Sequence, residues 1–505
     1  MIFIVPSTET GASLGHLKQL VIHTLPFGVA ALASILERDG IPVTIINDSI
    51  TPVTEEIIRH MAAQEPGRPV FGITSLTLQA ARAIELHALI LRTIPEAVVV
   101  VGGIHATALP EEFLEAGFKY VFSGEADLVI SDIARLLADG QEIDHLPGVI
   151  SKKQHGEIRR NPQPGMIELD ALPPFPYHLF GDHLSHYDLG AVMSSRGCPY
   201  QCIFCSQRAI TGVSHRTRPV AHVLDEITTL AERYQIDFIT FFDDNFLVDR
   251  NWSRQLCQGI VERGLHRHVK FMCQMRGDAV TEETLGLLAS AGFVALSFGI
   301  ETGSERVAEF IKKGESVQSN IKAVHVAKQR SFTVLGTFII GFPTETARER
   351  QQTLQLALQL PLDVMRVNIA IPYPGTPLFH MTRDCLTICP GWSNFNVVSP
   401  LVTGPFKKQP LPYIPEGASD DELRALMVWN NLRFWLKPQG IANFFFKKST
   451  FVTRMPKRWY VQPEMVVSLA KTACSVLANL IWVAVTFLKL RLRQAGEKAS
   501  DRGLV

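Results

Sequence analysis

The segment Gly197-Cys-Pro-Tyr-Gln-Cys-Ile-Phe-Cys205 directly follows an apolar run, Leu189–Ser194, with the composition of a buried strand. Its three cysteines have the spacing C-x3-C-x2-C. Thiolates bind zinc or iron–sulfur clusters, but a structural zinc site takes four ligands, usually from paired C-x2-C knuckles, and no second knuckle accompanies this loop. Three thiolates on a four-iron cube leave one iron open to a substrate. The loop therefore predicts a catalytic cluster rather than three unrelated buried thiols.

Strand and helix patterns alternate around this loop, from Leu189 to Pro377. Six strand–helix units predict a partial (β/α)6 barrel of the TIM type, whose active site lies at the carboxyl ends of the strands. Polar residues gather at three of these ends, in Asp243-Asp-Asn245, Arg276-Gly-Asp278 and Glu301-Thr-Gly303. The predicted strands are Leu189–Ser194, Phe238–Phe242, Val269–Gln274, Ala295–Gly299, Thr333–Ile340 and Met365–Ile371. The predicted helices are Val220–Tyr234, Trp252–Arg263, Glu282–Ala291, Glu305–Lys313, Asn320–Arg330 and Ala347–Leu360.

The N-terminal part shows the same alternation and predicts an α/β domain with a doubly wound, Rossmann-like parallel sheet. No Gly-x-Gly-x-x-Gly loop follows its first strand, which argues against a nicotinamide site. The predicted strands are Met1–Val5, Val43–Asn47, Val70–Ser75, Val98–Gly102 and Tyr120–Ser123. The predicted helices are Phe27–Arg38, Glu55–Ala63, Leu78–Leu91, Glu111–Glu115 and Asp127–Ala138.

Two strand ends in this part are candidate ligand contacts. Gly102 and Gly103 follow a buried strand and allow a ligand to approach the backbone, and His105 comes just after them. Gly124 and Glu125 follow the next strand. Ligands of such sheets bind at the carboxyl ends of the strands, although an ordinary turn with a solvated histidine is the alternative.

The composition narrows the class of protein. With 505 residues, of which 46% are hydrophobic and 19% charged, the chain is a folded protein of several domains. The 49 Lys and Arg balance the 49 Asp and Glu, so we expect no nucleic-acid partner. Eight cysteines are too few for a disulfide framework, and the N-terminal MIFIVPS does not read as a secretion signal. We therefore expect a cytoplasmic protein.

We divide the chain into the first α/β domain (1–140), a small β excursion with a Pro-rich linker (141–187), the barrel (188–378) and a mainly helical C-terminal region (379–505). In the last part, Thr472–Leu488 runs for 17 residues without a charge and has basic flanks. A spanning helix needs about 20 apolar residues. We therefore predict an interfacial helix that holds the protein on the cytoplasmic membrane face as a peripheral or monotopic protein, with a buried core helix as the alternative.

The cysteine loop, with Phe204 before its last thiol, resembles that of the radical S-adenosylmethionine enzymes. Several other segments resemble the branch of that superfamily with an N-terminal cobalamin-binding domain, and together the similarity covers most of residues 1–377. These segments are Gly102–Thr107, Ser123-Gly-Glu125, Phe242–Phe246, Phe298–Glu305, Gly341–Glu345 and Pro374–Pro377.

The resemblance implies that Cys198, Cys202 and Cys205 hold a [4Fe-4S] cluster, whose open iron binds S-adenosylmethionine and cleaves it to a 5′-deoxyadenosyl radical. It also implies further contacts to S-adenosylmethionine. Phe204 would lie near the adenine, and Glu301 and Arg276 are candidates for the ribose and methionine ends, with Glu301 balancing the sulfonium charge. Gly299 and Gly341 would allow close backbone approach.

The resemblance further implies a bound cobalamin. Its edge or tail would contact five residues, none of them a metal ligand: Ser75, Gly102, Gly103, His105 and Glu125. Histidine-ligating cobalamin domains carry Asp-x-His-x-x-Gly, which His105 does not fit, since Gly103 stands two residues before it and Ala108 three after. We therefore expect no histidine ligand on the lower face of the cobalt.

The expected activity is a radical S-adenosylmethionine methyltransferase that transfers a methyl group to an unactivated carbon of a lipid. The chain looks most like the hopanoid methylases, and hopanoid C-3 methylation is the reaction that this resemblance implies. An oxidative cyclase similar to the anaerobic magnesium-protoporphyrin monomethyl ester cyclases is the alternative, and a non-catalytic cobalamin-binding regulator is a second one. The expected partners are a lipid-like substrate, a reductase or flavodoxin or ferredoxin as electron donor, and a membrane surface.

Overall fold

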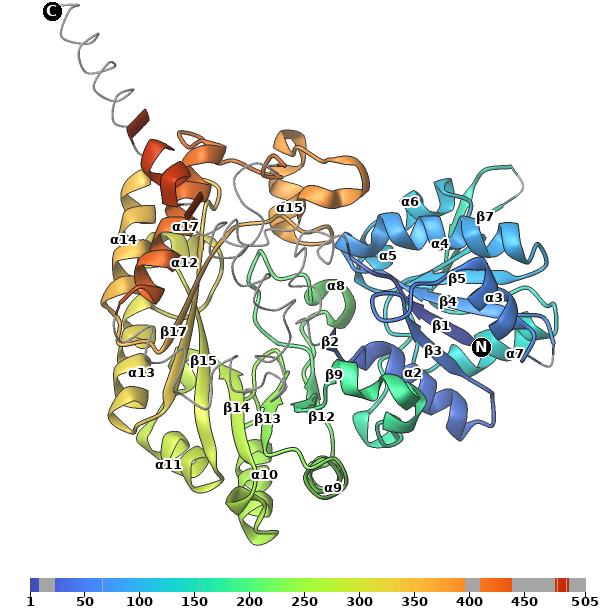
Figure 1. The fold of residues 1–505 in the computed structure, drawn as a ribbon, viewed down its shortest axis with the longest axis horizontal. Coiled ribbons are helices and arrows are strands. Elements are labelled where there is room, and N and C mark those ends of the chain that lie inside the picture. The colour runs from blue at the N-terminus through green and yellow to red at the C-terminus, as the bar shows by residue number, and fades with distance from the viewer. Residues whose placement is uncertain are drawn as a thin grey trace, which may run out of the picture.

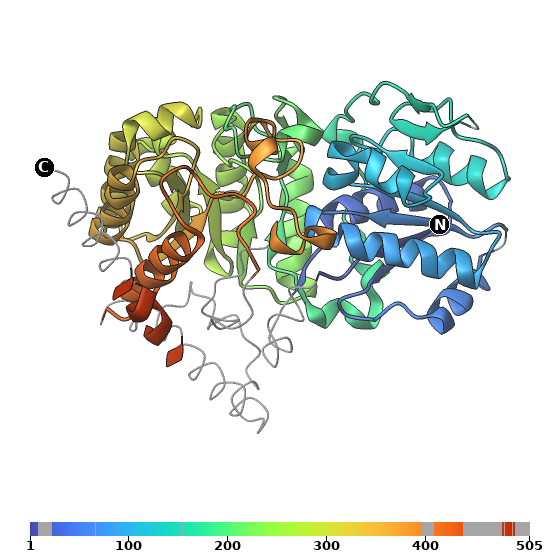
Figure 2. The same cartoon turned by 90° about the horizontal axis from the view of Figure 1, so that it is seen from above.

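The computed structural model describes residues 1–8, 23–65, 67–153, 155–395 and 409–437, and a last helical segment at 477–478, 480–486 and 488–489. Two α/β bodies lie side by side, the N-terminal one around the blue strands and the second around the green and yellow ones (Figures 1 and 2). Each body is built on a largely or wholly parallel sheet, which confirms the predicted fold class.

The first sheet has seven strands in the order β3-β1-β4-β5-β6-β7-β8. The first five of these are parallel, and β7 and β8 pair antiparallel. The chain passes from β1 to β3 on one side and then crosses to β4 on the other, so a ligand crevice is expected at the carboxyl ends of β1 and β4. The strands are β1 (Ile2–Val5), β3 (Thr44–Asn47), β4 (Val70–Thr74), β5 (Val98–Gly102), β6 (Tyr120–Phe122), β7 (Val149–Lys152) and β8 (Ile158–Arg160).

The helices of this domain cover both faces of the sheet. Strands such as Val98–Gly102 are apolar along their length because both faces are buried. The predicted β excursion forms β7 and β8, which extend this sheet. The helices are α2 (Phe27–Arg38), α3 (Glu55–Ala62), α4 (Ala80–Thr93), α5 (Ile104–Ala108), α6 (Pro110–Glu115) and α7 (Ile130–Ala138), with a 3-10 turn η2 (Thr77–Gln79).

The second sheet has six parallel strands in sequence order, β10-β13-β14-β15-β16-β17, which confirms the predicted partial barrel. Its helices lie on the outer side of the curved sheet, as Figure 1 shows for α11, α13 and α14. The strands are β10 (Ala191–Val192), β13 (Phe238–Phe241), β14 (Lys270–Met275), β15 (Phe293–Glu301), β16 (Thr333–Ile340) and β17 (Val364–Ile369). The helices are α9 (Val220–Arg233), α10 (Arg250–Glu262), α11 (Glu282–Ser290), α12 (Glu305–Phe310), α13 (Val317–Gln329) and α14 (Ala347–Gln359).

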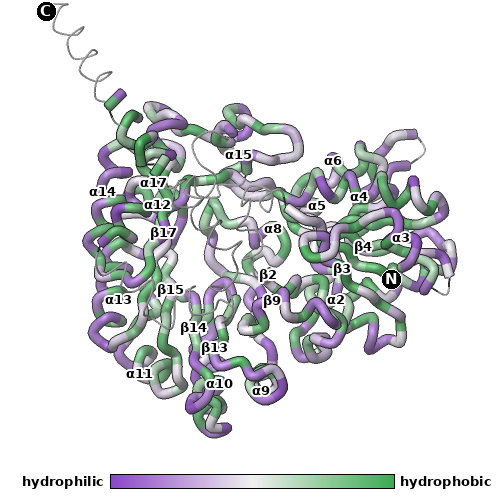
Figure 3. The backbone as a smooth tube through the Cα atoms, in the orientation of Figure 1, coloured by the Kyte–Doolittle hydropathy of each residue, from purple (hydrophilic) through white to green (hydrophobic). Residues whose placement is uncertain are grey.

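Local sequence explains where several of these helices begin. Thr346 accepts a hydrogen bond from the Glu349 backbone, and the Glu349 carboxylate accepts one from the Thr346 backbone, which forms a capping box at the start of α14. Hydrophilic and hydrophobic residues alternate along the surface helices (Figure 3). One face of each such helix therefore packs on the sheet and the other meets solvent.

The C-terminal region covers the open edge of the second sheet. Helix α17 (Asp420–Trp435) packs on β17, the last strand, and Ser419 caps its first turn. The Asn431 side chain accepts a hydrogen bond from the Val367 backbone N–H at 3.1 Å and donates one to the Val367 carbonyl at 3.0 Å. A side-chain amide thus takes the place of a neighbouring strand.

Two other C-terminal segments are described. The chain after the barrel forms α15 (Pro377–Thr382) and two 3-10 turns, η7 (Arg383–Cys385) and η8 (Pro390–Phe395), and η8 packs on η2 and α4 of the first domain. Within the residues that the structure covers, no helix has the length and apolar character that crossing a membrane requires. Of the predicted interfacial helix, Thr472–Leu488, residues 477–478, 480–486 and 488 lie in the last helical segment, and residues 472–476, 479 and 487 lie outside the described residues.

The contacts of Asn431 predict a specific loss of stability. Asn431→Ala leaves the backbone groups of Val367 buried and unpaired, so the free energy of unfolding should fall by about 2 kcal/mol. Asn430→Ala is the control, because Asn430 donates only to the Leu426 carbonyl of its own helix. Denaturant unfolding measures the loss, and hydrogen exchange of Val364–Ile369 locates it. Equal effects of the two substitutions on exchange in β17 would contradict the edge-strand role.

Candidate active site

The thiol loop is held between two short strands. Strand β11 (Ser195–Arg196) leads into it and pairs antiparallel with β12 (Arg216–Thr217). Gly197 has φ +85°, and a Cβ there would lie 2.3 Å from the Ser214 carbonyl oxygen, so only glycine fits. The loop begins where the first barrel strand ends, so it lies at the carboxyl edge of the second sheet.

The three predicted cluster ligands lie together and partly buried. Burial raises the pKa of each thiol. Burial, together with the smaller effects of the Asp244, Cys202 and Cys198 charges, raises the pKa of Cys205 to about 11. The nearby Arg276 and Lys313 act in the opposite direction on the pKa of Cys198 and of Cys202. Without a metal the thiols therefore keep their protons at neutral pH, and a bound iron cluster would displace them.

Arg276, a predicted S-adenosylmethionine contact, holds the thiol loop. Its guanidinium lies 3.7 Å from the centre of the Tyr200 ring, which belongs to that loop. It donates to the Asp278 carboxylate at 2.8 and 3.1 Å and to the Lys313 carbonyl at 2.5 Å. Most of its donors are thus already bonded within the protein.

Glu301, the predicted partner of the sulfonium, ends β15 in a left-handed conformation, φ 67°. Its buried carboxylate accepts a hydrogen bond from Lys313 Nζ at 3.3 Å, and Lys313 also lies 3.5 Å from Glu315. Burial raises the pKa of Glu301, and Lys313 opposes that shift. A Cβ on Gly299 would lie 2.5 Å from Glu301 Oε1, so Gly299 leaves room for this pair.

The network around Glu301 carries a net negative charge. Two cations, Arg276 and Lys313, face three carboxylates, those of Asp278, Glu301 and Glu315, which leaves one negative charge. A buried cationic ligand requires an excess of negative charge of this kind. From the sequence, Glu301 was the only carboxylate predicted to supply it. Lys313 and Glu315 were not predicted as site residues. The only feature of the sequence that could have indicated them is their position just after α12.

A large cavity lies between the two domains; with the solvent space at its mouth included, its empty volume is about 1570 Å³. The first domain lines it with Gly102, Gly103 and Glu125 and with the ends of β4 and β5. A branch runs between the first sheet and helices α2 and α7. The second domain contributes residues of the thiol-loop region and the end of β13. The branch is lined by Met1, Phe3, Val29, Leu32, Gly72, Ile130 and Ile133, and the second domain supplies Met193, Ser195, Arg196, Gln207, Ile210, Thr211, Phe242 and Asp244.

Comparison with known proteins places both domains. Residues 192–357 match the Radical SAM superfamily and residues 21–134 match the B12 binding domain. Over 464 residues, 90% of this chain and 96% of the relative, the chain is 30% identical to the uncharacterized methyltransferase PH0819 of Pyrococcus horikoshii. The chain belongs to the cobalamin-binding radical SAM enzymes. Its cofactors are accordingly a [4Fe-4S] cluster, S-adenosylmethionine and cobalamin, as predicted, and the predicted enzyme class, a radical SAM methyltransferase, is confirmed.

Other relatives have different named activities. The chain is 23% identical to the anaerobic magnesium-protoporphyrin IX monomethyl ester cyclase of Cereibacter sphaeroides (86% of this chain, 70% of the relative). It is 24% identical to the hopanoid C-3 methylase of Methylococcus capsulatus (72% of this chain, 69% of the relative). Its fold is similar to the radical SAM methyltransferase TsrM of Kitasatospora setae, solved with cobalamin and a [4Fe-4S] cluster (TM-score 0.66, 16% identity, 82% of this chain and 88% of that one).

The residues present fit a [4Fe-4S] cluster with its ligand and a cobalamin. Three thiols and a charge network with an excess carboxylate suit a cluster that binds a cationic ligand. The cavity between the domains is lined by Gly102, Gly103 and Gly124 at the ends of first-domain strands, where the backbone itself forms the wall. A Cβ on Gly103 would lie 2.9 Å from the Ser75 backbone nitrogen, so the predicted contact Ser75 lies buried behind Gly103.

Two other predicted contacts of S-adenosylmethionine, Phe204 and Gly341, lie close to Phe342. The Phe204 ring lies 5.7 Å from that of Phe342, and both belong to a small apolar cluster beneath the thiol loop. Gly341 has φ +89° and donates its backbone N–H to Glu345 at 2.5 Å. The structure thus brings Phe204 and the Gly341 turn together.

His105 lies apart from the cavity. Its ring is buried, with Nδ1 3.3 Å from Thr77 Oγ1 and Nε2 3.1 Å from Glu112, and Glu112 also accepts a hydrogen bond from the Trp392 indole. This network joins η8 to the first domain. The buried position of His105 is therefore explained by the packing of the C-terminal region on the first domain. His105 is not among the residues that line the cavity.

Asp244 is a cavity residue that the sequence placed at a strand end without assigning it a role. It lines the cavity beside the thiol loop and accepts a hydrogen bond from the Gly197 backbone N–H. Burial raises the pKa of Asp244, and its charge in turn raises the pKa of Cys198 and Cys205. Its exposed surface faces the cavity, so a bound cation can reach it.

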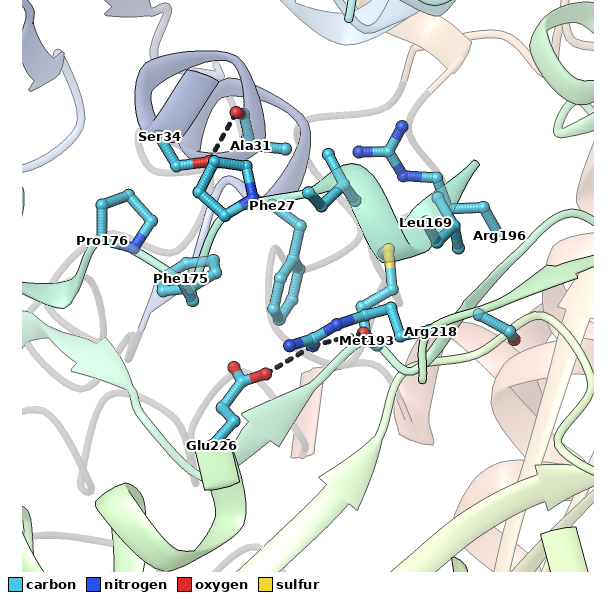
Figure 4. Close-up of a pocket in the computed structure, with 13 residues that line it drawn as sticks. Phe27, Ala31, Ser34, Leu169, Phe175, Pro176, Met193, Arg196, Arg218 and Glu226 are labelled. Carbon is cyan, nitrogen blue, oxygen red and sulfur yellow. Dashed lines mark hydrogen bonds and ion pairs between the residues drawn. The ribbon is translucent and has the colours of Figure 1, made fainter. Parts of the chain in front are cut away.

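A smaller side pocket, with about 490 Å³ of empty volume, adjoins the main cavity (Figure 4). Phe27 and Arg196 line both. Its other walls come from α2 and from the linker residues Leu169 to Pro176, and the buried ion pair Arg218–Glu226 lies at one side.

Gly299 gives the first prediction for this site. The Cβ of Gly299→Ala would displace the Glu301 carboxylate from Lys313, so binding of S-adenosylmethionine to the cluster-containing protein should weaken about tenfold. Gly286→Ala is the control, since its Cβ would meet only the Arg330 side chain at 3.8 Å. Isothermal titration calorimetry gives both affinities. Unchanged binding by the Gly299 variant would remove Glu301 and Lys313 from the ligand site.

Glu345 gives a second, pH-dependent prediction. Burial raises its pKa to about 7, above the usual 4.5, so its contribution to stability is present below pH 4.5 and lost as the pH rises through 7. The wild type should therefore lose on the order of 3 kcal/mol relative to Glu345→Gln between these limits. Denaturant unfolding of both proteins across the pH range measures the difference. A difference that does not vary with pH would contradict the raised pKa.

Proposed function

We propose that this radical SAM methyltransferase transfers a methyl group to an unactivated carbon of a lipid-like substrate, such as C-3 of a hopanoid. The observation that carries the proposal is the cavity between the domains, because the thiol-loop region and the strand ends of the B12 binding domain line the same space. A substrate in this cavity would lie within reach of both cofactors.

The proposed roles of the residues follow from their positions. When bound, the cluster with S-adenosylmethionine supplies a carbon radical and cobalamin supplies the methyl group. Cys198, Cys202 and Cys205 would hold the cluster. Glu301 with Lys313, and Asp244 beside the thiols, would bind the charged groups of S-adenosylmethionine. A reductase, flavodoxin or ferredoxin would supply the electron.

Phe204, Phe342 and the apolar residues around them would exclude water from the radical site. Of the cobalamin contacts, Gly102, Gly103 and Glu125 line the cavity. Shielding from solvent matters because the carbon radical must meet the substrate before any solute that carries a C–H or S–H group.

Exposed apolar side chains favour a lipid. Leu76 and Phe242 line the cavity and are 54% and 43% exposed. In the last helical segment Val483 is buried against the core, while four apolar residues at helical spacing are exposed. Such a face is suited to a membrane surface on the cytoplasmic side, from which a lipid could be taken. The four residues are Leu477, Ile481, Val485 and Leu488.

Mass-spectrometric lipid profiling tests the substrate. A strain lacking the gene should lose a lipid that is one CH2 unit heavier than its parent, and the wild-type gene should restore it. Cys202→Ala should not restore it, because the cluster would lose a ligand. Cys257→Ala should, because Cys257 is a buried residue of α10 far from the thiol loop in sequence. An unchanged lipid profile with accumulated porphyrin monoester would instead identify an oxidative cyclase.

A further inference from the structure

Glu125 belongs to a buried cluster of four charges that joins the two domains. Glu125 and Asp127 follow β6 of the first domain, and Arg196 and Arg216 come from β11 and β12 beside the thiol loop. Arg216 Nη2 lies 2.6 Å from Glu125, and Arg196 Nη1 lies 3.0 Å from Asp127 and 3.5 Å from Glu125. The four side chains are 5–14% exposed, so these ion pairs are shielded from solvent.

Arg196 also fixes the start of the thiol loop. Only Gly197 separates it from Cys198, and the Arg196 backbone pairs with Arg216 in the β11–β12 hairpin. Its side chain therefore ties the first cluster ligand to the loop after β6. A movement of that loop would reach Cys198 through one residue.

Two oxygens of the cluster lack hydrogen-bond partners. Glu125 Oε2 and Asp127 Oδ1 are buried, and neither accepts an aligned hydrogen bond although Arg196 lies within 3.5 Å. Both residues line the main cavity. These two oxygens form ion pairs with Arg196 but accept no aligned hydrogen bond, so they can still accept one from a ligand in the cavity. Because two arginines already balance the two carboxylates, a neutral donor such as a primary amide fits better than a cation.

We propose that Glu125 and Asp127 accept hydrogen bonds from the amide groups at the edge of the cobalamin ring, and that Arg196 couples this contact to the thiol loop as a positioning residue. Bound cobalamin would fix the positions of the two carboxylates, and the carboxylates would fix the Arg196 side chain through their ion pairs. Arg196 in turn would keep Cys198 in the position that the cluster requires. Each cofactor therefore strengthens the binding of the other, because such coupling is reciprocal.

Cobalamin titration tests this coupling without any substrate, so it is independent of the substrate proposed above. Hydroxocobalamin is added to cobalamin-free full-length protein, once with and once without the reconstituted cluster, and absorbance gives the two Kd values. The wild type should bind more tightly with the cluster. Arg196→Gln should weaken binding to the cluster-containing protein about tenfold and remove the difference between the two forms.

Arg218→Gln is the matched control. Arg218 follows the same hairpin, is 13% exposed against 14% for Arg196, and pairs with Glu226, but it does not line the main cavity (Figure 4). Both Kd values should stay at the wild-type level.

Asp127→Asn keeps the volume of the side chain and serves if Arg196→Gln does not fold, and it should shift the same Kd values in the same direction. Wild-type affinities that do not depend on the cluster, or an Arg196 variant that keeps the dependence, would overturn the proposal.

Discussion

Charges near the carboxyl ends of the two sheets must be balanced inside the protein, because most of the charged side chains there are buried. Two networks provide this balance. Around Glu301 and Lys313 the carboxylates exceed the cations by one, which suits a cationic ligand. Around Arg196 and Glu125 the charges cancel, which suits a neutral one. The first network lies within the barrel, whereas the second joins the barrel hairpin β11–β12 to the loop after β6 of the first domain. The protein thus has two different electrostatic environments near its strand ends.

Glycine positions keep these networks in place. Gly299 leaves room for Glu301 to reach Lys313, and Gly197 lets the thiol loop pass close to Ser214. A side chain at either position would move a charged or ligating group rather than a surface residue. Gly299 and Gly197 are therefore as much a part of the site as the Glu301 carboxylate and the Cys198 thiol that follow them.

The sequence allowed the strands and helices to be predicted because each buried strand is an apolar run; Phe27–Arg38 and Thr333–Ile340 have the predicted ends. The thiol spacing and the resemblance predicted the cofactors. The sequence could not supply the partners of the charged residues, since Arg196 meets Glu125 only through the tertiary fold. His105 shows the same limit: a histidine after paired glycines reads as a ligand contact, but a five-residue helix turns it toward Trp392, far along the chain.

An open barrel with six strands leaves the outer edge of its last strand, β17, without a neighbouring strand, and this edge links the C-terminal region to the active site. Asn431 of α17 forms hydrogen bonds with the backbone of Val367 at the edge of β17. The Trp392 indole donates a hydrogen bond to Glu112 of the first domain. The C-terminal region, which covers the edge of the barrel sheet, therefore also contacts the first domain and helps to fix the relative position of the two domains around the cavity. A change of substrate within this architecture can use the exposed face of the last helical segment and the cavity rim at Leu76 and Phe242, because neither takes part in these structural contacts.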